Sequence, residues 1–327
     1  MGWIRIENMK LLEVPVGEID LQDERFRFSY HFDLEKLLLS IKTVGVISPL
    51  MVAERENNRF VIVCGWKRIS ACRQLSVRKI PVCLVDEPDD FRLFLLSVYE
   101  NWAVRRFDIL EKAEIINKLH GFIKDERKIV KQYFPLLDIP ASLSYLDLYI
   151  EIARLDPGWK KILSEKKIPL SSIQILTEFT PEDREALMPL ILPLNMNKLK
   201  QFCLDLYELS KKTGDSPKDL LSIPEIRSVC GSEKLSPLQK ADKVRSFVKS
   251  KRYPALSTWE KSFRKSLEKA RMAKDVVFDA SSFFEDGEFS VTFSLFDRDA
   301  FLKRISRLKE LSADEDLFSL FENDSDG

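Results

Sequence analysis

The chain has 327 residues, and its 52 Lys and Arg residues balance its 52 Asp and Glu residues, so the formal net charge at pH 7 is zero. A chain of this length is expected to form roughly two or three domains, and its charge balance argues against a protein that binds a polyanion over its whole surface, although local basic patches remain compatible with it. The five cysteines form no C-x-x-C pair and only two histidines are present, which argues against a zinc site and favours reduced thiols.

Neither a secretory signal nor a transmembrane segment is visible. The first ten residues contain no apolar run followed by small residues. No stretch reaches the roughly 20 apolar residues that span a bilayer. We therefore expect a cytoplasmic protein with no membrane partner.

The first 120 residues alternate short strands and helices. Gly45 suits the end of a first helix, and Asp89 or Asp90 and then Asp108 suit the caps of two later ones. The predicted strands cover 11–14, 50–53, 59–63 and 80–85, with a hairpin turn over 54–58. The predicted helices cover 34–44, 66–75, 91–102 and 109–120. This mixture predicts an α+β fold for domain 1–120.

Helical periodicity dominates from residue 121 onward. Residues 121–212 carry seven prolines and are expected to form an all-helical middle domain. Residues 213–236 are rich in Ser, Gly and Pro and are expected to be a linker. Residues 237–311 are expected to hold two basic helices and a small β-hairpin plus helix unit, with 297–311 as its helix. The acidic tail 312–327 is expected to be disordered.

Three short segments near the N-terminus carry the chemistry. They are Gly45-Val46-Ile47-Ser48-Pro49-Leu50, then Gly65-Trp66-Lys67-Arg68-Ile69-Ser70-Ala71-Cys72, then Glu100-Asn101 followed by Arg105-Arg106 and Glu111-Lys112-Ala113. A glycine between a strand and a helix lets backbone N–H groups approach an anion at the helix N-terminus.

The charges in these segments fit a bound polyphosphate. Lys67 and Arg68 lie in a first helical turn, where they oppose the helix dipole unless a ligand supplies negative charge. Glu100 and Asn101 offer oxygen ligands for a phosphate-bound Mg²⁺. The plainer alternative is that Gly65 makes a turn and the two cations form a solvated face.

The order of the three segments resembles the N-terminal domain of the ParB/RepB partition family, which has the ParB/sulfiredoxin fold. That family has a G-[VIL]-[IL]-x-P turn, a G-x-x-R-x-x-A junction and an E-N box, and the resemblance covers about residues 10–120. It implies a CTP-binding switch in which two N-terminal domains close around DNA. The nucleotide-binding residues that it implies are Ser48, Gly65, Lys67, Arg68, Glu100, Asn101 and Arg105, with Mg²⁺ held by Glu100 and Asn101.

Several positions depart from the family pattern. Trp66 and Lys67 replace Glu and Arg, and Lys lacks the bidentate fork of Arg. Ser48 stands where Gln is common, and Arg105 is displaced by one position. The resemblance therefore leaves open whether the chain hydrolyses CTP slowly. One alternative is a binding module that kept the fold and lost the nucleotide.

Two enzyme alternatives share the fold. Sulfiredoxins place a reactive cysteine where this chain has Trp66, which argues against that activity. A small-molecule kinase that uses Glu100 or a nearby carboxylate as base is a further alternative, although no second acid stands at a telling spacing.

A helix-turn-helix outline is expected after the first domain, over 127–137 and 142–155. The second of these helices should read bases, but it carries Asp147 and Glu151 against Arg154, which makes it a poor recognition helix. A degenerate packing module is the alternative.

A basic stretch offers a better expected DNA contact. Residues 240–274 hold twelve Lys or Arg against three Asp or Glu. A solvated helical face, or a partner for the acidic tail, is the alternative. The residues singled out for DNA contact are Lys249, Lys251, Arg252, Arg264 and Lys265.

The partners expected from these features are DNA and a second copy of the chain. The small apolar face of the last helix favours a homodimer, with packing on its own chain as the alternative. A nucleoid-associated role in chromosome or plasmid partition follows from the resemblance, which leaves open whether a partner ATPase exists.

Overall fold

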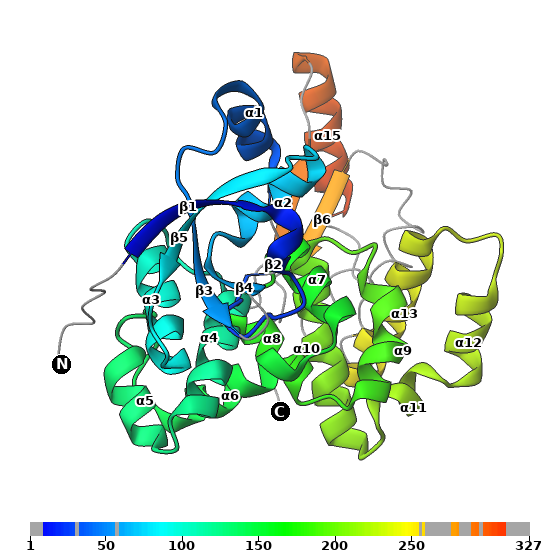
Figure 1. Cartoon of the computed structure of the whole chain (residues 1–327). Coiled ribbons are helices and arrows are strands. Elements are labelled where there is room, and N and C mark those ends of the chain that lie inside the picture. The colour runs from blue at the N-terminus through cyan, green and yellow to red at the C-terminus, as the bar shows by residue number, and fades with distance from the viewer. Residues whose placement is uncertain are drawn as a thin grey trace. The chain divides into compact units, whose positions relative to one another are not determined.

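A computed structural model of the chain describes residues 9–29, 33–55, 59–254, 257–258, 276–280, 289–293 and 297–311 (Figure 1). The chain divides into two compact units, Met1–Pro181 and Glu182–Gly327. Each unit is described by itself below. Within the described residues no helix is both long and apolar enough to cross a membrane.

The first unit is built on a mixed five-stranded sheet. Its strands are β1 (Met9–Pro15), β2 (Ile19–Asp20), β3 (Leu50–Arg55), β4 (Arg59–Cys64) and β5 (Lys79–Val85), and their order is β1-β5-β3-β4-β2. β1 with β5 and β3 with β4 are antiparallel pairs, whereas β3 with β5 and β2 with β4 are parallel. The predicted α+β class is confirmed.

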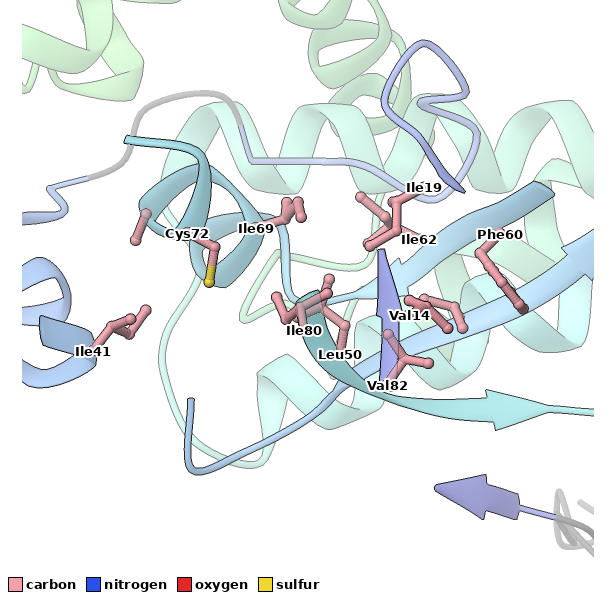
Figure 2. Close-up of a cluster of buried hydrophobic side chains, with 12 residues drawn as sticks. Val14, Ile19, Ile41, Leu50, Phe60, Ile62, Ile69, Cys72, Ile80 and Val82 are labelled. Atoms are coloured by element: carbon pink, nitrogen blue, oxygen red, sulfur yellow. The ribbon is translucent and has the colours of Figure 1, made fainter. Parts of the chain in front are cut away.

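The core of this unit gathers branched side chains from the central strands. Leu50, Ile62, Ile80 and Val82 are each fully buried (Figure 2). Val52 of β3 is fully buried as well. Such β-branched and aliphatic residues suit strands covered on both faces. Burial of each side chain stabilises the fold by about 1.5–3 kcal/mol relative to exposure. The two motif segments that flank β3 and β4 therefore stand on a rigid support.

Two helices complete the first half of this unit. α1 (Glu35–Val44) ends at Gly45, whose φ of 76° lies in the left-handed region that glycine tolerates. α2 (Trp66–Gln74) begins directly after β4 and buries Ile69 and Cys72 against the core. Both helices were predicted, α1 from its apolar spacing and α2 from its start directly after Gly65.

The helices that follow begin where the sequence places acidic caps. α3 (Asp90–Trp102) is capped by Asp89, which accepts from the Phe91 N–H. α4 (Ile109–Phe122) is capped by Asp108, and Glu111 completes a capping box. The remaining helices of this unit are α5 (Glu126–Tyr133), α6 (Leu143–Arg154), α7 (Pro157–Lys166) and α8 (Leu170–Thr177).

The boundary expected at residue 120 does not separate compact units. α4 packs against α6, so the first helices after residue 120 share a core with the N-terminal residues. Ile115, Ile116 and Leu146 are fully buried, as this packing requires. The units therefore divide the chain at residue 181, within the range expected to be the helical middle domain.

The second unit begins with five helices. They are α9 (Pro181–Ile191), α10 (Met196–Thr213), α11 (Pro217–Leu221), α12 (Pro224–Gly231) and α13 (Pro237–Arg252). α10 and α13 pack together, and Leu199, Phe202 and Val248 are fully buried. Its C-terminal part contains an antiparallel pair, β6 (Val276–Ala280) with β7 (Phe289–Phe293), and the helix α15 (Arg298–Leu311).

The expected linker 213–236 contains two helices. α11 starts at Pro217 after a Ser216 cap, and α12 starts at Pro224. Proline is favoured at the first position of a helix because the N–H that it lacks would be unpaired there. The Ser and Pro residues that suggested a linker are therefore helix-start signals. The other expected irregular segment, 312–327, lies outside the described residues.

Candidate functional site

All seven residues expected to bind a nucleotide line one cavity of about 360 Å³ in the first unit. They come from the loop before β3, the start of α2, the end of α3 and the loop before α4. They are Ser48, Gly65, Lys67, Arg68, Glu100, Asn101 and Arg105. A volume in this range suits a small-molecule site.

The backbone at Gly65 shapes one side of the cavity. Its φ of 112° lies in the left-handed region, and a Cβ added there would lie 2.9 Å from the Leu50 Cγ. No side chain caps the N-terminus of α2 and no acidic residue lies in its first turn. This helix end therefore presents partial positive charge toward the cavity, as an anion site requires.

Arg68 ties two motif segments together. Its guanidinium donates to the backbone oxygen of Ser48 at 3.1 Å and also to the backbone oxygen of Pro49. Its Nη2 lies 3.8 Å from Oε1 of Glu100. The side chain is held against the cavity wall by protein groups.

Glu100 brings a half-exposed carboxylate to the cavity, beside the buried thiol of Cys64. Burial, followed by the negative charge of Glu100, raises the pKa of Cys64 to about 12. A thiol with this pKa stays protonated at neutral pH and is a poor nucleophile. Cys64 is thus part of the wall, as expected for a strand core thiol.

Asn101 and Arg105 belong to one hydrogen-bond network. Asn101 Nδ2 donates to the Ser97 backbone oxygen at 2.9 Å, and Arg105 Nε donates to Asn101 Oδ1 at 3.3 Å. Arg105 also donates to Glu111 Oε2 at 2.6 Å and to Ser29 Oγ at 3.1 Å. Both predicted residues are thus engaged with protein partners.

Sequence reasoning missed three residues of the loop 20–29 that line the site. Phe26, Phe28 and Ser29 from this loop line the cavity, and both phenylalanines are buried. The guanidinium of Arg27 lies over the Trp66 ring at 4.8 Å from its centroid. The alternation of Arg and Phe over residues 25–28 was the available signal. Trp66 forms part of the wall and leaves the cavity open.

Residues 5–102 match the family model described as the ParB N-terminal domain. The N-terminal part of the chain therefore carries a ParB N-terminal domain. It is similar to a probable chromosome-partitioning protein ParB from Borreliella burgdorferi, with 28% identity over 189 residues that span 56% of this chain and 68% of that protein. It is also similar to the nucleoid occlusion protein of Bacillus thuringiensis, with 26% identity over 34% of this chain and 38% of that protein.

Two solved ParB structures also match the chain. A Pnob8-like ParB-N domain is 16% identical, covers 77% of this chain and 97% of that chain, and gives a TM-score of 0.36. A truncated Caulobacter crescentus ParB complexed with CTP-gamma-S is 18% identical, covers 52% of this chain and 92% of that chain, and gives a TM-score of 0.27.

The helix pair at the position of the expected helix-turn-helix is α5 and α6, which pack together. On α6 the exposed charged residues are Asp147, Glu151 and Arg154, and Arg154 donates to Glu151 at 2.7 Å. The outer face of α6 therefore carries no net positive charge. This agrees with the expectation that it is a poor recognition helix for a ParB-like protein.

The residues expected to contact DNA fall into three groups. Lys249 and Lys251 lie near the end of α13, and Lys251 is exposed. Arg252 has an 11% exposed side chain and forms salt bridges with Asp205 and Glu208 of α10, so protein carboxylates already contact its guanidinium. Arg264 and Lys265 lie outside the described residues. The sequence count of acids missed Asp205 and Glu208 because they come from another helix.

Proposed function

We propose that this chain is a ParB-like DNA-associated protein that binds CTP with Mg²⁺ in its first unit and acts as a switch in DNA partition or regulation. The observation that carries the nucleotide part is the meeting of the three motif segments at one cavity. The partition part rests on the family and on the names of the relatives. A nucleoid-associated location belongs to the same proposal.

Charge supports a polyphosphate ligand. The charged residues that line the cavity are Lys67, Arg68 and Arg105 against Glu100, three cations and one carboxylate. The uncapped N-terminus of α2 adds partial positive charge at the same wall. An anion bound there is expected to gain from both sources, and the gain is largest where water is excluded.

The residues at the cavity fit Mg²⁺ unequally. The Glu100 carboxylate, with 39% of its side chain exposed, suits a phosphate-bound Mg²⁺, which keeps most of its ligands as water and phosphate oxygens. Asn101 Oδ1 already accepts from Arg105, so it offers its second lone pair. When bound, the ion would neutralise phosphate charge, and Glu100 is the residue best placed to hold it.

Calorimetry tests the nucleotide proposal. CTP with Mg²⁺ is titrated into the full chain, and Arg68→Ala is compared with Arg73→Ala, a cation in the last turn of the same helix. We expect binding to the natural chain and to Arg73→Ala, and a loss of at least tenfold for Arg68→Ala. Absence of heat with any of the four nucleoside triphosphates would remove the switch and leave the fold.

A second candidate is a DNA-binding module that ignores nucleotide. It is favoured by the protein partners already held by Arg68 and Arg105. It predicts DNA retention on a filter that is the same with and without CTP and that falls steeply as salt rises. A CTP-dependent change in retention would favour the switch instead.

A further inference from the structure

Arg105 is oriented by acceptors from three separate segments. Its Nε donates to Asn101 at the end of α3, its Nη1 to Glu111 in the first turn of α4, and its Nη2 to Ser29 in the loop after β2. Each guanidinium nitrogen thus has a fixed partner. A side chain with several rotatable bonds keeps one orientation only when such partners hold it.

Glu111 is the centre of this arrangement. Its side chain is 10% exposed, and it accepts from Arg105, from the Ser29 hydroxyl and from the Asp108 backbone N–H at 3.2 Å. Oε1 accepts from the Ser29 hydroxyl, and Oε2 accepts both from Arg105 at the cavity wall and from the Asp108 N–H at the start of α4. Ser29 bonds to both Glu111 and Arg105, so the loop 20–29 is fastened at the same point.

We propose that Ser29 and Glu111 are positioning residues that hold the Arg105 guanidinium and, through it, the Asn101 amide at the wall of the nucleotide cavity. This inference rests on the proposed nucleotide binding. Neither residue needs to touch the ligand. Their contribution is to fix the direction of a cation and an amide before the ligand arrives, which saves the ordering that a free side chain would need.

Because Glu111 is negatively charged, electrostatics and positioning predict opposite changes in nucleotide affinity when the charge is removed. A negative charge beside the cavity repels a polyphosphate, so Coulomb attraction alone predicts that Glu111→Gln tightens nucleotide binding. Positioning predicts the opposite, because the neutral amide holds Arg105 less firmly. Glu111→Gln retains the ability to accept from the N-cap N–H, which limits damage to α4.

The experiment measures the Kd of CTP with Mg²⁺ by calorimetry for the full chain and its variants. Glu111→Gln and Ser29→Ala are compared with Glu114→Gln, which alters another buried carboxylate of α4, bonded to Lys160 at 2.6 Å. We expect binding roughly tenfold weaker for Glu111→Gln, a smaller loss for Ser29→Ala and no change for Glu114→Gln. Thermal unfolding of each variant is recorded in parallel.

A coupled variant separates positioning from stability. In an Arg105→Lys chain the three-way fork is gone, so Glu111→Gln and Ser29→Ala should each shift Kd by less than about twofold. Unchanged or tighter binding for both single variants, or an equal loss in Glu114→Gln, overturns the positioning role. If the natural chain binds no nucleotide, the proposed function fails first, and that result is distinct from these. Should Glu111→Gln fail to fold, Ser29→Ala and its coupling to Arg105→Lys decide the matter.

Discussion

The guanidinium of Arg68 donates to the backbone oxygen of Ser48 at 3.1 Å, so the second motif segment is bonded directly to the first. The two residues are 20 positions apart and are separated by the β3–β4 hairpin. The hairpin returns the chain so that α2 starts beside the turn before β3. The first two motif segments, which are separate patterns in the sequence, are therefore connected in the structure by this hydrogen bond.

Replacing Arg68 with Lys should weaken this connection between the first two motif segments. The ammonium keeps the charge, but its single nitrogen cannot both donate to Ser48 and Pro49 as Nη1 does and face Glu100 as Nη2 does. We expect a loss of about 1–2 kcal/mol of unfolding free energy, with nucleotide binding weakened in parallel. Urea denaturation measures the first effect, and Arg73→Lys in the last turn of α2 serves as the control. Equal effects of the two substitutions would contradict a specific stabilising role for the Arg68 hydrogen bonds.

Gly65→Ala should destabilise the first unit by about 1–3 kcal/mol. The residue has φ of 112°, and the new Cβ would lie 2.9 Å from Leu50 Cγ, which belongs to the core. Gly17→Ala is the matched control, because a Cβ there has nothing within 4 Å and its φ is not in the left-handed region. Chemical denaturation of both variants should show the loss for Gly65 alone.

Arg252 should matter for stability rather than for DNA contact. Its removal leaves Asp205, which is 1% exposed, as a buried charge with less compensation. We expect Arg252→Met to cost about 3–5 kcal/mol, whereas Lys251→Met, an exposed neighbour, should change stability by less than about 0.5 kcal/mol. Guanidinium unfolding of the two variants gives the comparison. A small effect at Arg252 would show that the salt bridges are not needed.

Lys249 and Lys251 should matter for DNA binding rather than for stability. Replacing both with Glu is expected to lower DNA retention and to weaken the dependence of log K on log salt, since the slope falls by about 0.9 for each phosphate that is no longer neutralised. Filter retention over a range of salt concentrations tests this. An unchanged slope would exclude this end of α13 as a DNA-binding surface.

The buried thiols predict a loss of stability at high pH. Burial raises the pKa of Cys203 to about 12 from an ordinary value of 9.0. Below pH 9 the thiol is protonated in both folded and unfolded chains and contributes no slope. Between about pH 9 and 12 only the unfolded chain loses the proton, so stability falls as pH rises. Cys203→Ala should make this fall shallower, by up to about 1.4 kcal/mol per pH unit. Identical slopes would contradict the pKa shift.

Local signals in the sequence were enough for four of the five strands and for the first four helices of the first unit. Asp89, Asp108 and Gly45 mark the ends of helices because each satisfies backbone groups in its own neighbourhood. The motif segments also predicted which residues share the cavity. The Ser-Pro pair at 216–217 was misleading, because the same residues that begin helices are also common in linkers.

Long-range partners could not be read from the sequence. Ser29 meets Glu111 across 82 positions, and Arg252 meets Asp205 across 47. Such pairs depend on how helices and loops pack, which residue spacing does not encode. For the same reason, counting charges along the basic stretch overestimates the positive charge of α13. Asp205 and Glu208, which neutralise part of it, belong to α10.

The central claim is that the N-terminus of α2 forms a cradle for a polyphosphate. Nuclear magnetic resonance of the amide groups of Trp66, Lys67 and Arg68 during titration with CTP and Mg²⁺ tests it at the atoms concerned. We expect large, saturable shifts of these three amides, which are absent with cytidine lacking phosphates. Amides that stay unmoved while others in the chain respond, or that shift equally with cytidine, would contradict the cradle.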